Sequence, residues 1–312
     1  MSIIIMNREM DLISKFLREL SSQNTRRAYR SDLDSFFGSG KKGLRAAAVR
    51  EVTRSQIQAH LAGLRSDGKS VSTRRRRLSA LRRFYDWARD HGFVEKNPAR
   101  ECSIEDASSQ SSFRSQPSVL SKSEVEQLLR APREAGSAAV RNHGILLTIL
   151  YASLRRAEIA AMEVDHFRPL GRHWVIDLPA GSGRPGAYVK IPEPLVEAID
   201  AVQSRYDIDE GPLWRSLSNR NYGERLTPDA VYKIVRRTGK TAGLKDVSIE
   251  TLRHTGLRLA MQSGASVRQI QMHARLQSAT SVERYVDEET SSGRLTESAA
   301  EYLDLDLPDP PN

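Results

Sequence analysis

An arginine and a tyrosine near the end of this 312-residue chain have the types and spacing for chemistry on a phosphate group. Arg253 stands at the start of an amphipathic stretch over residues 251–263, and a guanidinium at a helix start, with basic residues upstream, can hold a phosphate. Tyr285 closes a helix predicted over residues 278–286. A tyrosine hydroxyl beside a bound phosphate can attack it and form a covalent intermediate.

A second arginine of interest is Arg155, which precedes the helical run RAEIAAME and has Glu158 three residues after it. Both candidates have an ordinary alternative. Arg155 and Glu158 fit a surface ion pair at helical spacing, and Tyr285 fits a half-buried aromatic residue on a helix.

Basic residues outnumber acidic residues, with 48 Lys and Arg against 39 Asp and Glu, a formal charge of +9 and a pI of about 9.8. This balance suggests a polyanionic partner, because guanidinium groups suit phosphate contacts, although charge alone fits a basic protein with no nucleic-acid role equally well. The single cysteine, Cys102, excludes a disulfide framework and a Cys-based zinc site. The chain shows no signal peptide and no apolar run of ~20 residues, so we expect a soluble, cytoplasmic protein.

Residues 72–92 are predicted to form a helix with one apolar face and many arginines on its other sides. A charge run is often only a solvated helix face. Here Asp86 and Asp90 are the only acidic residues nearby, which favours an element that contacts DNA phosphates. The arginines assigned to DNA binding are Arg74, Arg75, Arg76, Arg77, Arg82 and Arg83.

The pattern predicts a mainly α-helical protein with a small β-sheet and two domains. Residues 1–103 form a helical domain, 104–118 a linker rich in Ser and Gln, and 119–312 a second domain with a C-terminal tail. Apolar spacing predicts helices over 7–20, 25–37, 53–68, 72–92, 124–132, 138–151, 156–163, 192–206, 227–243, 251–263, 266–273 and 278–286, and strands over 174–178 and 187–191.

Four pieces in order resemble the tyrosine recombinases, also called the phage integrase family: LRRAEI, a glycine-rich hairpin, LRHT, and a tyrosine about 30 residues later. The resemblance covers nearly the whole chain and implies a helical core-binding domain followed by an α+β catalytic domain. Arg155 and Glu158 occupy the places of the family's (T/S)GLRxxE motif, so the resemblance implies that Arg155 and Arg253 clamp the non-bridging oxygens of the scissile phosphate while charge shifts in the transition state, and that Glu158 orients the neighbouring site. It also implies that Tyr285 forms a 3′-phosphotyrosyl link. A covalent link retains the phosphodiester energy, so neither a metal nor another cofactor is expected.

Three positions depart from the family pattern. Glu250 stands where the HxLRH motif has its first histidine. Leu276 stands where a histidine or tryptophan precedes the tyrosine by nine residues, within ARLQS in place of the usual LGHSS. Arg184 aligns with the hairpin lysine that protonates the departing 5′-oxygen, and an arginine is a poor general acid. Lys190 is the other candidate for that proton, unless it only ends a strand.

Other candidate groups surround these positions. His273 could reach the site in a shifted loop, and His254 matches a family histidine that is often structural. Glu250 could accept the proton of Tyr285 or, instead, neutralise Arg253. Because each lost acid–base group costs ~10²–10⁴-fold in rate, the enzyme could be slow or dependent on a partner subunit.

Two functions therefore stay open. The first is a site-specific recombinase that integrates, excises or resolves a DNA element. The second is an impaired recombinase-fold subunit that binds DNA beside an active relative. For the first, the resemblance implies double-stranded DNA with paired, inverted-repeat sites, a homotetramer on that DNA in the bacterial nucleoid, and docking of residues 295–303 onto a neighbouring subunit.

Overall fold

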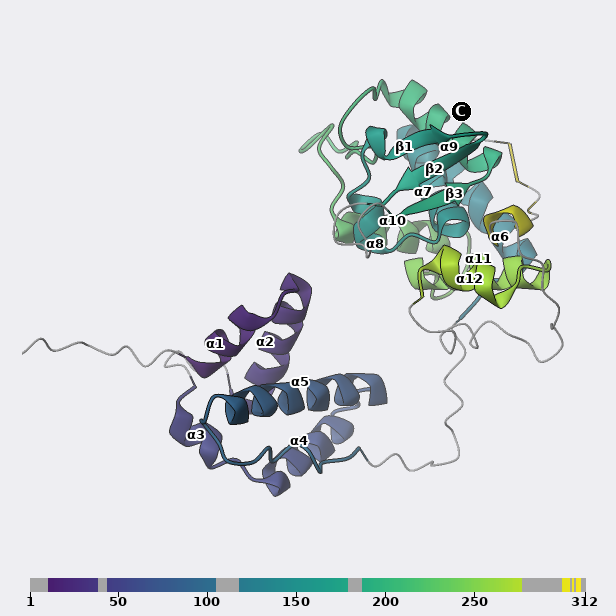
Figure 1. The fold of residues 1–312 in the computed structure, drawn as a ribbon. Helices are drawn as coiled ribbons and strands as arrows, with labels where there is room; N and C mark the ends of the chain where they lie inside the picture. The colour runs from purple at the N-terminus through teal and green to yellow at the C-terminus, as the bar shows by residue number, and fades with distance from the viewer. Residues whose placement is uncertain are drawn as a thin grey trace, which may run out of the picture. The chain divides into compact units, whose positions relative to one another are not determined.

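The computed structural model describes residues 11–38, 44–104, 118–178, 187–276, 299–303, 305 and 307–309. The chain divides into two compact units, Met1–Arg114 and Ser115–Asn312 (Figure 1). The division falls inside the segment 104–118 that is rich in serine and glutamine. In the described part of the chain, no helix combines the length and the apolar character that crossing a membrane requires.

The first unit is a helical bundle around an aromatic core. Phe16 and Phe84 meet edge to face with ring centroids 5.5 Å apart, and Tyr85 and Ile57 are fully buried beside them. Thr53 begins one helix with a reciprocal capping box that also involves Gln56. The helices are α1 (Leu12–Glu19), α2 (Gln23–Phe37), α3 (Ala46–Arg50), α4 (Arg54–Ser66) and α5 (Val71–Asp90).

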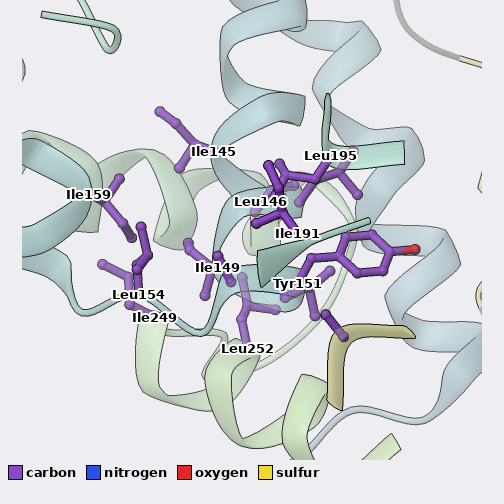
Figure 2. Packing of buried hydrophobic residues seen from close by; sticks show 14 of the residues in the cluster. Ile145, Leu146, Ile149, Tyr151, Leu154, Ile159, Ile191, Leu195, Ile249 and Leu252 are labelled. Carbon is purple, nitrogen blue, oxygen red and sulfur yellow. The ribbon is translucent and has the colours of Figure 1, made fainter. Parts of the chain in front are cut away.

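The second unit is built around one buried helix, α7 (Ala139–Ala152), every residue of which is buried. Figure 2 shows Ile149 of this helix with Ile159, Ile191 and Leu252 on different sides of it. The other helical elements are α6 (Lys122–Arg130), η1 (Ala131–Ala138), α8 (Arg156–Ala160), η2 (Val164–His166), α9 (Glu193–Tyr206), α10 (Pro228–Thr241), α11 (Ile249–Gln262), α12 (Val267–Ala274) and η4 (Ala299–Tyr302).

The second unit also contains an antiparallel three-stranded sheet, in the order β1 (Phe167–Leu170), β2 (His173–Asp177) and β3 (Tyr188–Ile191). One face carries residues that pack against the core, among them Ile176 and Val189, which are cross-strand partners. The strands β2 and β3 confirm the predicted hairpin. The strand β1 was not predicted, because Pro169 and Arg168 weaken its alternating pattern.

The C-terminal segment packs onto its own chain. Ala299, Ala300 and Leu303 are buried in the core, and the Tyr302 ring lies beside Gly264, 3.6 Å from the place that a Cβ there would occupy. This packing confirms an apolar face in the segment, while docking onto a second subunit stays a prediction.

Helices α7 and α11 approach each other closely at Gly256. A Cβ at this position would lie 2.3 Å from the Leu150 carbonyl oxygen, so only glycine allows the observed contact. This contact sets the position of α11, which carries Arg253, relative to the C-terminal end of α7.

Candidate active site

The site forms where α7 ends. Ser153 caps the helix in the left-handed conformation, with φ 50° and ψ 36°, and its N–H donates to the Ile149 carbonyl. The carbonyl of Ser153 accepts hydrogen bonds from two guanidinium groups, from Nε of Arg253 at 3.0 Å and from Nη2 of Arg275 at 3.1 Å. Positive groups are favoured here because the helix dipole leaves partial negative charge at the C-terminal end.

Arg155 and Glu158 form the second part of the site, at the start of α8. The Arg155 backbone N–H donates to Oε2 of Glu158 at 2.7 Å, and Nη1 of Arg155 donates to Oε1 at 3.0 Å. The Glu158 side chain is 5% exposed and the Arg155 side chain 43%. A carboxylate this buried needs charged partners, whereas the guanidinium of Arg155 remains open to a ligand.

Arg275 joins the two parts. Its Nη2 donates to Oε2 of Glu158 at 2.7 Å as well as to the Ser153 carbonyl, and its side chain is only 13% exposed. Burial lowers the pKa of Arg275 to about 10. Glu158 opposes this shift, and the charges of Arg155 and Arg253 add to it. The group therefore stays protonated at neutral pH. Arg155 and Arg275 share the Glu158 carboxylate, and Arg253 joins them through the Ser153 carbonyl. This excess of positive charge suits an anionic ligand.

His273 is buried beside these arginines. Burial lowers its pKa to about 4, with further lowering by Arg275 and Arg253 against a hydrogen bond with the Tyr151 backbone. The imidazole is therefore neutral at pH 7. It can position neighbouring groups, but it is not charged and ready to donate a proton as an imidazolium.

The other candidates lie as follows. Glu250 is exposed in the first turn of α11 and forms no ion pair with any residue that the structure describes. His254 is half-buried on the same helix, and Leu276 packs partly buried against the core. Lys190 lies in β3 opposite Val175. Tyr285 and Arg184 lie outside the described residues.

The structure thus brings together Arg155, Glu158, Arg253 and His273. Sequence reasoning missed two participants, Arg275 and the Ser153 carbonyl. One sequence signal for Arg275 was available, since it occupies the glycine position of the family's LGHSS pattern; the structure gives this residue the left-handed conformation, with φ 55°. The role of the Ser153 carbonyl depends on contacts with Arg253 and Arg275, which are distant in the sequence, so the residues around Ser153 could not indicate it.

Some arginines of α5 contact other parts of the first unit, and others are exposed on its surface. Arg76 and Arg77 lie against the buried Asp32, and Arg77 also donates to the Ser35 hydroxyl at 2.6 Å. Desolvation raises the pKa of Asp32, although Arg76 and Arg77 oppose that shift. Arg82 donates to the carbonyls of Ala99 and Cys102, at 3.2 and 2.5 Å, and Arg74 is buried, whereas Arg75 and Arg83 are exposed.

Two further basic hollows were not predicted. One lies between α1 and α2 and is lined by Ser14, Leu17, Arg18, Gln23, Arg26, Arg27 and Arg30. The other lies at the end of α10 and is lined by Arg236, Arg237, Lys240, Leu244, Lys245, Asp246 and Val247. Clustered arginine and lysine side chains are typical of surfaces that contact nucleic-acid phosphates. Among the described residues, no group of three or more His, Cys, Asp or Glu side chains could hold a metal ion.

Comparison with protein families gives two matches. Residues 13–92 match the N-terminal SAM-like domain of phage integrases, and residues 118–291 match the phage integrase family. A tyrosine recombinase XerC of Thermodesulfovibrio yellowstonii is 28% identical over 284 residues, covering 87% of this chain and 88% of the relative. A tyrosine recombinase of Synechococcus elongatus is 27% identical over 313 residues, covering 95% and 94%.

Solved structures share the fold. The XerH recombinase bound to a palindromic difH substrate, a post-cleavage complex, superposes with a TM-score of 0.66 at 17% identity, covering 88% of this chain and 90% of that chain. A lambda integrase tetramer bound to a Holliday junction superposes with a TM-score of 0.66 at 16% identity, covering 92% and 79%.

Proposed function

The chain belongs to the phage integrase family, the tyrosine recombinases that cleave and rejoin DNA strands, and on this premise we propose that its arginine cluster binds the scissile phosphate of a recombination site. One observation carries the proposal. Arg155 and Arg253, which come from different helices, converge on a network formed by the Glu158 carboxylate and the Ser153 carbonyl. A phosphate diester needs such a set of cations fixed before the reaction begins.

In the proposed mechanism, Arg155 and Arg253 bind the non-bridging oxygens and stabilise the charge that develops on them. The hydroxyl oxygen of Tyr285 attacks the phosphorus, the bond to the 5′-oxygen breaks, and a 3′-phosphotyrosyl link forms. Attack by an incoming 5′-hydroxyl on that link releases the tyrosine and rejoins the strand. The energy of the phosphodiester is retained throughout, so the residues of the chain and the DNA suffice.

Proton transfer is assigned to groups other than the usual ones. Glu250, exposed at the start of the helix that carries Arg253, is the proposed acceptor for the Tyr285 proton. Lys190 is the better of the two proposed donors to the leaving oxygen, because a lysine releases its proton more readily than Arg184 would. Leu276 offers no proton in place of the family's histidine. This assignment predicts slower chemistry than in relatives with the complete set.

DNA engagement is proposed to involve both units. Arg75 and Arg83 on α5 and the arginines between α1 and α2 would contact backbone phosphates. The unit over residues 1–103 would do so independently of the unit over 119–312, with 104–118 as linker. XerH on a palindromic site and the lambda integrase tetramer on a Holliday junction support the proposal that this chain acts as a tetramer on paired, inverted-repeat sites.

The test is a covalent trapping experiment. A binding site would be selected from a pool of random-sequence duplexes with the wild-type protein and then synthesised with a nick near its centre, so that the short cleaved fragment diffuses away. We expect a shifted protein–DNA band on a denaturing gel with the wild-type protein. We expect no such band with Tyr285→Phe, which keeps its DNA affinity.

Tight site binding without any band would instead support a DNA-binding subunit. If the band then appeared only when a related active recombinase was added, the chain would act as an accessory partner. If the band persisted in Tyr285→Phe, the nucleophile would be a different residue.

A further inference from the structure

We propose that Arg275 is a positioning residue that couples Arg155 to Arg253, so that the two cations meet the phosphate as one unit. The inference rests on the proposed function, because it assumes that these two arginines bind the scissile phosphate. It adds a residue to the site at a position where the family pattern has a glycine.

The first argument is the geometry of one nitrogen atom. Nη2 of Arg275 donates to Oε2 of Glu158 at 2.7 Å and to the Ser153 carbonyl at 3.1 Å. Each of these acceptors also receives a hydrogen bond from one of the two phosphate-binding candidates, since Nη1 of Arg155 lies 3.0 Å from Oε1 of Glu158 and Nε of Arg253 lies 3.0 Å from the Ser153 carbonyl. Arg275 therefore links the pair of Arg155 and Glu158 to the pair of Arg253 and Ser153.

The second argument is burial. The Arg275 side chain is 13% exposed, against 43% for Arg155, so Arg275 lies behind the groups that a ligand would meet. Its Nε is buried and has no hydrogen-bond partner among the described residues, and its Nη1 donates to the His273 carbonyl at 3.5 Å, so the shortest contacts of the side chain are those of Nη2. A buried guanidinium in this place acts through its neighbours.

The third argument is charge. Glu158 alone would neutralise Arg155, because the two form a close pair. Arg275 supplies a second cation to the same carboxylate, so Arg155 keeps more of its positive potential for a phosphate while staying oriented. The cluster then carries an excess of positive charge that only an anionic ligand can balance.

The backbone offers a suitable variant for the test. Arg275 has φ 55°, a conformation that glycine adopts without strain. Arg275→Gly therefore removes the guanidinium while relaxing the backbone, and Arg275→Lys keeps the charge but loses the forked donor. Arg268→Ala, an exposed arginine on the same helix, is the matched control.

The experiment measures the rate of covalent adduct formation on the nicked duplex, the affinity for the intact duplex and the thermal midpoint of each variant. For Arg275→Gly we expect the rate to fall on the order of 10²-fold with unchanged affinity, as misplacement of catalytic groups typically causes. Arg275→Lys should lie between this variant and the wild type, and Arg268→Ala should match the wild type. In an Arg155→Lys background the loss caused by Arg275→Gly should be much smaller, since both changes break one unit.

The outcomes separate this inference from the proposed function. Absence of an adduct with the wild-type protein would overturn the proposed function itself. An adduct with the wild type together with an undiminished rate in Arg275→Gly would overturn only the role of Arg275. An equal loss in the Arg155→Lys background, or a loss of rate that merely follows a fall in affinity and midpoint, would overturn it as well. If Arg275→Gly does not fold, a wild-type rate in Arg275→Lys contradicts the proposal and a reduced rate at full affinity supports it.

Discussion

Nη2 of Arg275 lies 2.7 Å from Oε2 of Glu158, although 117 residues separate the two along the chain. This contact joins the end of α12 to the start of α8 and leaves a buried carboxylate between two guanidinium groups. A buried ion pair stabilises a fold only while both partners are present, because removal of one leaves an uncompensated charge in a poorly solvated place. The site is therefore also an element of the fold's stability.

Glu158→Gln is predicted to lower the free energy of unfolding by about 3 kcal/mol, as breaking buried ion pairs typically does. The matched control is Glu163→Gln, which removes the carboxylate that contacts Arg225 in a more exposed place. That change should cost at most about 1 kcal/mol. Urea unfolding of both variants measures the difference. Equal effects would contradict the importance assigned to burial of the Glu158 carboxylate.

Stability is predicted to fall in acid through His273. Its folded pKa of about 4 lies below the ordinary value of 6.5, so the unfolded chain takes up a proton first as the pH falls. Above pH 6.5, His273 does not lower the free energy of unfolding. As the pH falls below that value the loss grows, and it reaches about 2 kcal/mol at pH 5. Unfolding measurements at pH 7 and pH 5 should show a smaller difference in His273→Gln than in the wild-type protein. An unchanged difference would show that His273 is not buried as a neutral group.

Gly256→Ala is predicted to destabilise the second unit, because its methyl group would lie 2.3 Å from the Leu150 carbonyl oxygen. The expected cost is about 1–3 kcal/mol or more, since backbone atoms must move. Gly63→Ala in α4 is the control, because nothing lies within 4 Å of its Cβ position. Calorimetry should show a lower midpoint for the first variant and a slightly higher one for the second, where a helix gains alanine. A tolerated Gly256→Ala would contradict the close approach of α7 and α11.

Arg75→Ala combined with Arg83→Ala is predicted to weaken DNA binding on all sequences. The slope of the logarithm of the binding constant against the logarithm of the salt concentration should become shallower by about 0.9 per lost phosphate contact. These two arginines are exposed, whereas Arg76 and Arg77 also lie against Asp32 and would mix stability with binding. Arg54→Ala, which removes an exposed pair with Glu101, is the control. A salt slope equal to that of the wild type would place α5 away from the DNA.

The sequence predicted the helical elements and the hairpin well because their signals are local. Thr53 and Ser121 cap their helices with Gln56 and Glu124, each three residues along the chain, and the apolar stretch of α7 is buried throughout. The pairing of Arg155 with Glu158 follows from their spacing of three residues at a helix start. These features depend on neighbours along the chain.

The remaining features depend on tertiary contacts. Arg275 reaches Glu158 only because α12 packs against α11, and nothing in the sequence near Arg275 indicates a distant carboxylate. The sequence alone does not show which arginines of α5 contact other residues of the protein and which remain exposed. Two of them, Arg76 and Arg77, lie against Asp32, which is on another helix, and this pairing depends on the packing of α2 against α5.

The measurement that tests the account most directly compares adduct formation and DNA affinity in Arg253→Ala. If Arg253 stabilises the phosphate in the transition state, the rate of adduct formation should fall by about 10²–10³-fold, as loss of such a donor typically causes, while the affinity for the intact duplex stays close to that of the wild type. An adduct rate equal to that of the wild type would contradict the assignment of this cluster as the centre of catalysis.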